Sequence, residues 1–237
     1  MKRAKEKGIY HLFLEEGVHI VTEYIDSLCS ESSGWHHSAG EEMPYVLLTE
    51  AWTISGAGRG KTIVKGGGFK IPSPSGYSSE VYCPTLEDIT VWKTKGYGLL
   101  AVGYEFCCLR VHFTECGRCG VFAKEAKGRL IDCQITQCLK SGIATWRSAI
   151  IEMAGRQTKV DGNGTSGSGS AYGLNAYSLT STIDLFAPLT KESVSTNNRS
   201  GKNCGGEGTI QTVNSLCQQF HFTHRTIGEN AYEELNM

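Results

Sequence analysis

The sequence has few prolines, no long apolar run and no excess of charge of either sign, and each of these absences excludes a class of protein. Only 5 of the 237 residues are proline, against 29 glycines, a balance that favours many tight turns over a disordered linker. No run of about eighteen apolar residues occurs, so the sequence predicts no membrane-spanning segment. The formal net charge is -1 and the two signs are interspersed, which argues against a nucleic-acid partner.

The N-terminal region also lacks the apolar core of a secretory signal peptide. Charged and histidine side chains interrupt residues 9–21, among them His11, Glu15 and His19. The 10 cysteines are spread along the chain, where free thiols behave as small buried hydrophobic groups. These features predict an intracellular, cytoplasmic protein with reduced thiols.

A repeat of 22 residues decides the fold. Segments that begin at Ile89, Val111 and Cys133 carry similar residues at matching positions, and apolar residues alternate with polar ones within each segment. Alternation with a period of two predicts short strands, here two per repeat, whose repeated columns face inward. A recurring glycine indicates a turn that needs positive φ or a close backbone approach. The columns are Val91, Phe113 and Ile135; Thr94, Cys116 and Cys138; Gly98, Gly120 and Gly142; and Leu99, Val121 and Ile143.

Strands too short to bury an inner face alone must stack on equivalent strands of the next repeat. We therefore predict an all-β fold, a single-stranded right-handed parallel β-helix of about seven or eight coils of ~22 residues. The predicted domain spans residues 1–213, with an insertion loop at about 27–42 and a Gly/Ser-rich loop at 161–170. Residues 214–237 break the pattern and are predicted to form an irregular C-terminal cap or tail, with a short helix at 229–235.

The sequence resembles the right-handed parallel β-helix repeat family, which includes the pectate-lyase-like proteins. The likeness is carried by Gly17-Val18-His19 and by the G-x-G-x-x-K-T phrase that ends at Thr62 and continues into Ile63-Val64. It covers residues 9–213 and implies the fold. It implies no particular activity, because β-helices serve as lyases, hydrolases, isomerases, adhesins and scaffolds.

Residues 55–62 look at first like a phosphate-binding loop. Ser55 stands where that motif needs its first glycine, and the segment after Thr62 has the pattern of a strand, whereas a phosphate loop opens a helix. A turn of the β-helix is therefore the prediction for this segment.

No catalytic, metal or cofactor site is predicted. The 5 aspartates are isolated, and Asp88 and Asp132 fall two coils apart on the same edge, about 10 Å from each other, which is wide for paired carboxylates. Zinc would need four converging ligands, whereas Cys116 and Cys138 belong to one inward column. Packing is the prediction for Cys107-Cys108 and Cys119 as well. His36-His37 is interpreted as a solvated polar pair, and no cysteine or carboxylate pattern that would complete a metal site accompanies His221 and His224.

An outer stripe of apolar and aromatic residues is the one candidate functional surface. If Leu99, Val121 and Ile143 face inward, their neighbours face outward, and a soluble monomer seldom leaves such a stripe bare. Either the 27–42 insertion or the C-terminal tail covers it, or it is a docking surface for a protein partner or a flat sugar-binding face. The outward residues are Leu100, Phe122, Ala144, Val102, Lys124 and Trp146, with Trp92 on the other strand column.

The sequence therefore predicts a non-catalytic structural or protein-interaction β-helix protein, with protein partners or a second copy of itself docking on Trp92, Leu100, Phe122 and Trp146. The alternative is a carbohydrate-binding or carbohydrate-active protein whose site lies on the loop at 161–170. In that case Asp161, Asn163 and Lys159 would contact the sugar.

Overall fold

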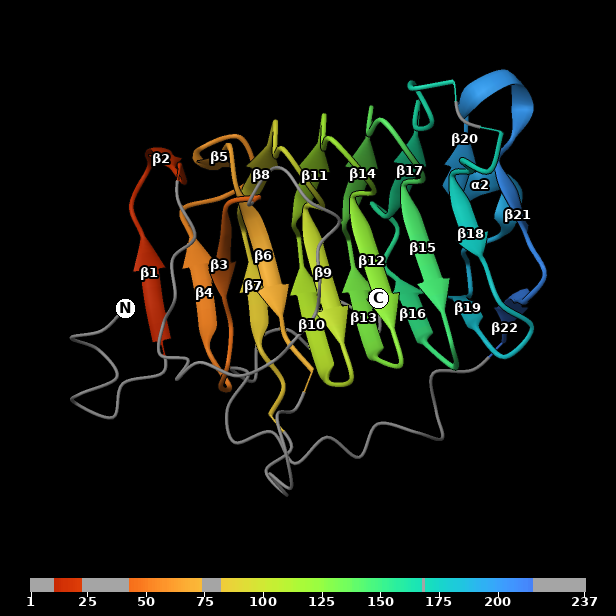
Figure 1. Ribbon diagram of the computed structural model, residues 1–237, viewed down its shortest axis with the longest axis horizontal. Helices are drawn as coiled ribbons and strands as arrows, with labels where there is room; N and C mark the ends of the chain where they lie inside the picture. The colour runs from red at the N-terminus through yellow and green to blue at the C-terminus, as the bar shows by residue number, and fades with distance from the viewer. Residues whose placement is uncertain (1–10, 23–42, 74–81, 168, 215–237) are drawn as a thin grey trace.

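The chain is a parallel β-helix, in which equivalent strands of successive coils stack side by side along the long axis of the molecule (Figure 1). The computed structural model describes residues 11–22, 43–73, 82–167 and 169–214. The predicted insertion at 27–42 and the predicted cap beyond Asn214 lie outside the described residues. None of the helices in the described part is long and apolar enough to cross a membrane.

The strands form three parallel sheets, which we call A, B and C. Sheet A contains β1 (His11–Leu14), β4 (Thr53–Gly56), β7 (Thr85–Glu87), β10 (Glu105–Leu109), β13 (Lys127–Ile131), β16 (Ile150–Ala154), β19 (Thr182–Phe186) and β22 (Thr209–Val213). Sheet B contains β2 (Gly17–Ile20), β5 (Thr62–Lys65), β8 (Thr90–Trp92), β11 (His112–Thr114), β14 (Gln134–Thr136), β17 (Lys159–Asp161) and β20 (Ser195–Thr196). Sheet C contains β3 (Tyr45–Leu47), β6 (Gly68–Ile71), β9 (Leu99–Val102), β12 (Val121–Lys124), β15 (Ile143–Trp146), β18 (Leu174–Ala176) and β21 (Cys204–Gly206).

Each regular coil has three strands, so the prediction of two strands per repeat was wrong. The chain runs through β10, β11 and β12 before it returns to sheet A as β13. The missed strand is the one in sheet A, because its inward residues change size from coil to coil. Phe106, Gly128 and Ile151 occupy one inward position of that sheet, and a column of unlike residues gives little repeat signal.

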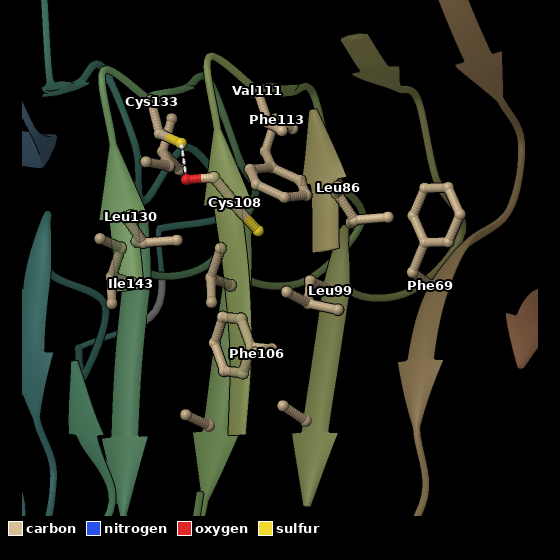
Figure 2. Close-up of a cluster of buried hydrophobic side chains, with 14 of the residues drawn as sticks. Phe69, Leu86, Leu99, Phe106, Cys108, Val111, Phe113, Leu130, Cys133 and Ile143 are labelled. Carbon is tan, nitrogen blue, oxygen red and sulfur yellow. Dashed lines mark hydrogen bonds between the residues drawn. The ribbon is translucent and has the colours of Figure 1, made fainter. Parts of the chain in front are cut away.

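The 22-residue columns are the register of the sheets. Phe113 pairs with Val91 on one side and with Ile135 on the other, and all three side chains are fully buried. Leu99, Val121 and Ile143 stack in the same way in sheet C. Figure 2 shows Phe113, Leu99 and Ile143 of these columns in one core. Burial of each such side chain contributes roughly 1.5–3 kcal/mol, so the stacked columns dominate the stability of the coils.

The glycine column reflects close packing. Gly98, Gly120 and Gly142 are absent from the residues with positive φ. A Cβ atom built on Gly120 would lie 2.4 Å from Cγ2 of Ile135, and one on Gly142 would lie 2.5 Å from Cγ1 of Val160. Glycine recurs here because the core residue of the next coil fills the space of a side chain.

Left-handed backbone is found instead at the corners, on charged and polar residues. Lys93, Glu115 and Gln137 follow the strands of sheet B with φ of 50°, 51° and 55°. Asp88, Arg110 and Asp132 follow the strands of sheet A with φ of 56°, 52° and 50°. A residue with a side chain pays roughly 1–2 kcal/mol for this conformation, so the stacking of the coils must offset that cost at every corner.

The loop predicted at 161–170 is only partly outside the coil. Asn163 is 1 % exposed, and its Oδ1 accepts the backbone N–H of Cys138 at 3.0 Å, while its own backbone N–H donates to Oδ1 of Asn198 at 2.9 Å. The inward column of Thr94, Cys116 and Cys138 thus continues in the next two coils with Asn163 and Asn198. Near them lie the short helix α2 (Lys191–Val194), capped by Thr190, and the 3-10 turn η1 (Arg199–Gly201).

Candidate interaction surface

The outward residues of sheet C include apolar side chains that stack on adjacent strands. Phe122 pairs in register with Leu100 of β9 and with Ala144 of β15, so the three side chains stack across adjacent coils. Leu100 and Phe122 are half-buried. We call Leu100, Phe122 and Trp146, together with Tyr97 and the outward Val102, the sheet C patch.

Ring contacts join this patch to the turn that enters sheet C. The rings of Tyr97 and Phe122 have centroids 5.2 Å apart and are tilted by 40°. The hydroxyl of Tyr97 accepts a hydrogen bond from Nη1 of Arg118 at 3.4 Å. At the far end of β15, Trp146 pairs in register with Lys124, whose Nζ lies 5.4 Å from the ring centroid. The patch thus lies along two rows that run across the strands, Leu100–Phe122–Ala144 and Val102–Lys124–Trp146.

Trp92 does not belong to this patch, and its grouping with the other three residues was wrong. It lies on β8 in sheet B, across the turn from sheet C. Its Nε1 donates to Glu115 at 3.0 Å, and the Nζ atoms of Lys65 and Lys93 lie 4.7 and 4.8 Å from its ring centroid. Trp92 is the centre of a small charged cluster on another face.

The buried thiols lie in the core. Cys116 and Cys138 are stacked and fully buried, and Cys133 Sγ contacts the carbonyl oxygen of Cys108 at 3.3 Å (Figure 2). Burial raises the pKa of the Cys119 and Cys133 thiols to about 12, so both stay protonated near neutral pH. Within the described ranges, no group of three or more His, Cys, Asp or Glu residues is placed to hold a metal ion. His36, His37, His221 and His224 lie outside those ranges.

Sheet A carries an outward polar row that sequence reasoning missed. Glu152 pairs in register with Arg129 and with Asp184, and its carboxylate contacts Arg129 at 2.9 Å and Lys127 at 3.0 Å. Asp184 accepts a hydrogen bond from Gln211 at 2.9 Å. Two neighbouring carboxylates resemble the pair of a glycoside hydrolase, but a general acid needs surroundings that favour its proton. Two cations in contact with Glu152 favour a structural ion pair.

A second polar chain on sheet A joins His11, Ser55 and Glu87. Nε2 of His11 lies 2.7 Å from Oγ of Ser55, and that hydroxyl donates to Glu87. The serine proton therefore points to a carboxylate, which is a weak base, and the histidine is on the wrong side to remove it. Separations of 44 and 32 residues hid this contact from a search for local motifs.

The segment that resembled a phosphate-binding loop is a turn between two strands. β4 ends at Gly56 and β5 begins at Thr62, so no helix follows the glycines. Arg59 reaches along the corner of the coil and donates to the backbone oxygen of Asp132 at 3.0 Å. Asp88 is held by both nitrogens of the Arg110 fork at 2.7 Å, which makes it part of a corner ion pair.

The loop offered for sugar binding does not present the predicted residues together. Asn163 is buried, and its amide bonds the backbone of Cys138 and Ile135 and the side chain of Asn198, so its assignment as a sugar contact was wrong. Asp161 accepts hydrogen bonds from Thr196 and Asn197 at 2.8 Å and lies 3.6 Å from Lys159. Burial raises the pKa of Asp161, but these partners outweigh it and hold the pKa below its usual value.

The fold and its outer faces define a parallel β-helix with an aromatic patch on sheet C. Comparison with protein-family models, with curated proteins and with solved structures gives no match. Function must therefore be inferred from the outer faces of the coils themselves.

Proposed function

We propose that this protein is a non-catalytic interaction module that docks a protein partner on the sheet C patch. The observation that carries the proposal is the stacking of half-buried Leu100 and Phe122 on adjacent strands, with Trp146 in the neighbouring row of the same sheet face. Aromatic side chains grouped on a rigid sheet are typical of the energetic centre of protein interfaces. Strands fixed by the core on their other side present these rings with little loss of conformational entropy on binding.

Catalysis has weaker support from the described residues. The carboxylate of Glu152 is neutralised by two cations, and the hydroxyl of Ser55 donates to a carboxylate. Neither arrangement supplies an activated nucleophile or a proton donor.

The experiment is affinity capture of the tagged protein from its native source, with quantification of near-stoichiometric partners by mass spectrometry. Phe122→Ser together with Trp146→Ser is the test variant. Leu109→Ser with Ile131→Ser is the matched control, because these half-buried apolar residues pair across the outer face of sheet A. Circular dichroism and the thermal midpoint must show that both variants fold.

We expect the test variant to lose its partner and the control to keep it, because removal of aromatic interface residues typically costs about 2 kcal/mol or more each. Equal recovery from the two variants would refute docking on sheet C. Loss of the partner only from the Leu109→Ser, Ile131→Ser control would place the interface on sheet A.

A further inference from the structure

The aromatic rings of the sheet C patch are lined by cations. The guanidinium carbon of Arg118 lies 5.5 Å from the ring centroid of Tyr97. Around Trp146, Nζ of Lys124 lies 5.4 Å and the guanidinium carbon of Arg147 lies 4.5 Å from the ring centroid. These distances are within the range of cation–π attraction, which holds each cation over the face of its ring. Lys124 is only 5 % exposed, contrary to the expectation that it faces outward, so Arg118 and Arg147 are the cations that the surface presents beside these rings.

Further cations lie on the turns that connect the strands of sheet B to those of sheet C. The backbone N–H of Lys140 donates to the carbonyl of Arg118 at 3.2 Å, so these two residues stack in adjacent coils. Lys95 and Lys140 are both exposed, and neither forms an ion pair with another described residue.

Acidic side chains do little to balance this charge. Glu125 faces Arg147 at 3.4 Å, but both side chains are about half exposed, where ion pairs are weak. Glu115 is turned toward sheet B, where it contacts Trp92 and Lys93. The whole chain carries a net charge of -1, so the cations beside the patch are a local excess.

We propose that the partner segment bound by the sheet C patch is acidic and carries apolar side chains between its carboxylates. This inference rests on the proposed function and adds the chemistry of the partner. Carboxylates of the segment would contact Arg118, Lys140 and Arg147. Its apolar side chains would cover Phe122 on β12, together with Leu100 and Val102 on the adjacent strand β9. Charge complementarity of this kind selects the partner and speeds association.

A carbohydrate fits the same surface less well. Sugars stack on open faces of aromatic rings, whereas the rings of Tyr97 and Trp146 already carry cations. An acidic polysaccharide or a single-stranded nucleic acid could neutralise the cations, but it brings no aliphatic side chains to cover Leu100 and Val102. A protein segment supplies both kinds of group.

Fluorescence anisotropy with short labelled peptides tests the inference on the full chain. The probes alternate Glu with Leu, Gln with Leu, Glu with Ser, and Lys with Leu; a polygalacturonate oligomer and a single-stranded oligonucleotide serve as competitors. Lys140→Glu is the test variant. Arg156→Glu is the control, because it makes the same change of charge at an exposed position on another corner. Phe122→Ser tests the apolar half of the surface.

The Glu/Leu peptide should bind most tightly, and its affinity should fall as salt is raised. Lys140→Glu should weaken it roughly 3- to 10-fold and Arg156→Glu by less than about twofold, as expected for exposed charges. Phe122→Ser should weaken both Leu-containing acidic and neutral probes.

Equal binding of the Gln/Leu and Glu/Leu peptides, with no effect of Lys140→Glu, would overturn the acidic partner. Tighter binding of polygalacturonate or of the oligonucleotide would show that this polymer, and not an acidic protein segment, is the ligand of the patch. Failure of every peptide to bind would also overturn the acidic partner. A different result refutes the proposed function: the captured protein partner still binds the variant in which Phe122 and Trp146 are changed to Ser.

Discussion

The phenyl ring of Phe106 occupies the space of the side chain that Gly128 lacks. The two residues pair in register in sheet A, and a Cβ atom built on Gly128 would lie 2.1 Å from Cζ of Phe106. A large and a small residue thus complement each other in this inward column, which keeps the core filled although its members differ.

This relationship predicts a rescue. Gly128→Ala should destabilise the protein by about 1–3 kcal/mol, because overpacking forces a rigid ring or the backbone to move. In the Phe106→Leu background the same change should cost clearly less, since the shorter side chain vacates the site. Urea unfolding of the four proteins gives the coupling energy. Costs that add without coupling would show that the two residues do not share this space.

The asparagines of the turns between sheets B and C predict a second stability effect. Oδ1 of Asn198 accepts the backbone N–H of Asn163 at 2.9 Å and its side-chain Nδ2 at 3.0 Å. Asn198→Ala would leave the buried backbone N–H of Asn163 without this acceptor, at a cost of about 1–3 kcal/mol, whereas Nδ2 keeps the carbonyl of Ile135. Thermal unfolding should show a clear drop in the midpoint, while Thr165→Ala, at an exposed position of the same loop, should change it little. Similar midpoints for the two variants would contradict an internal hydrogen-bond ladder.

Buried thiols predict a pH dependence of stability. Burial raises the pKa of Cys133 to about 12, whereas an unfolded cysteine has a pKa of about 8.5. The folded thiol therefore keeps its proton where the unfolded one loses it. Its contribution is complete below about pH 8.5 and is lost as the pH rises toward 12, at about 1.4 kcal/mol per pH unit.

The comparison of wild type with Cys133→Ala isolates this contribution from other groups that titrate in alkali. Denaturant unfolding at about pH 8 and about pH 10 should show the stability gap between the two proteins shrinking with pH. A gap of constant size would mean that Cys133 is not desolvated in the folded protein.

The regular coils could be predicted from the sequence because their columns repeat. Leu99, Val121 and Ile143 are alike in size and recur at a fixed period, so their stacking follows from the alternation alone. The third strand of each coil could not be found this way, because Phe106 and Gly128 complement each other and share no likeness.

The candidate surface was predicted only in part for a related reason. Alternation shows that Phe122 and Trp146 face outward, but it does not show how far the chain turns between sheets. Trp92, expected on the other strand column, was therefore grouped with them in one docking surface, although it lies in sheet B among Lys65 and Glu115. The cations over Trp146 come from its own strand end and the adjacent strand, and their stacking becomes visible only when the coils are aligned.

Site-specific photo-crosslinking tests the central claim, docking on sheet C, most directly. A photoreactive phenylalanine analogue is introduced at Phe122 in one protein and at Leu109, on the outer face of sheet A, in another. Each protein is irradiated with its captured partner. The account predicts a crosslinked product from position 122 and little or none from position 109. Crosslinking from position 109 alone, or equally from both, would contradict it.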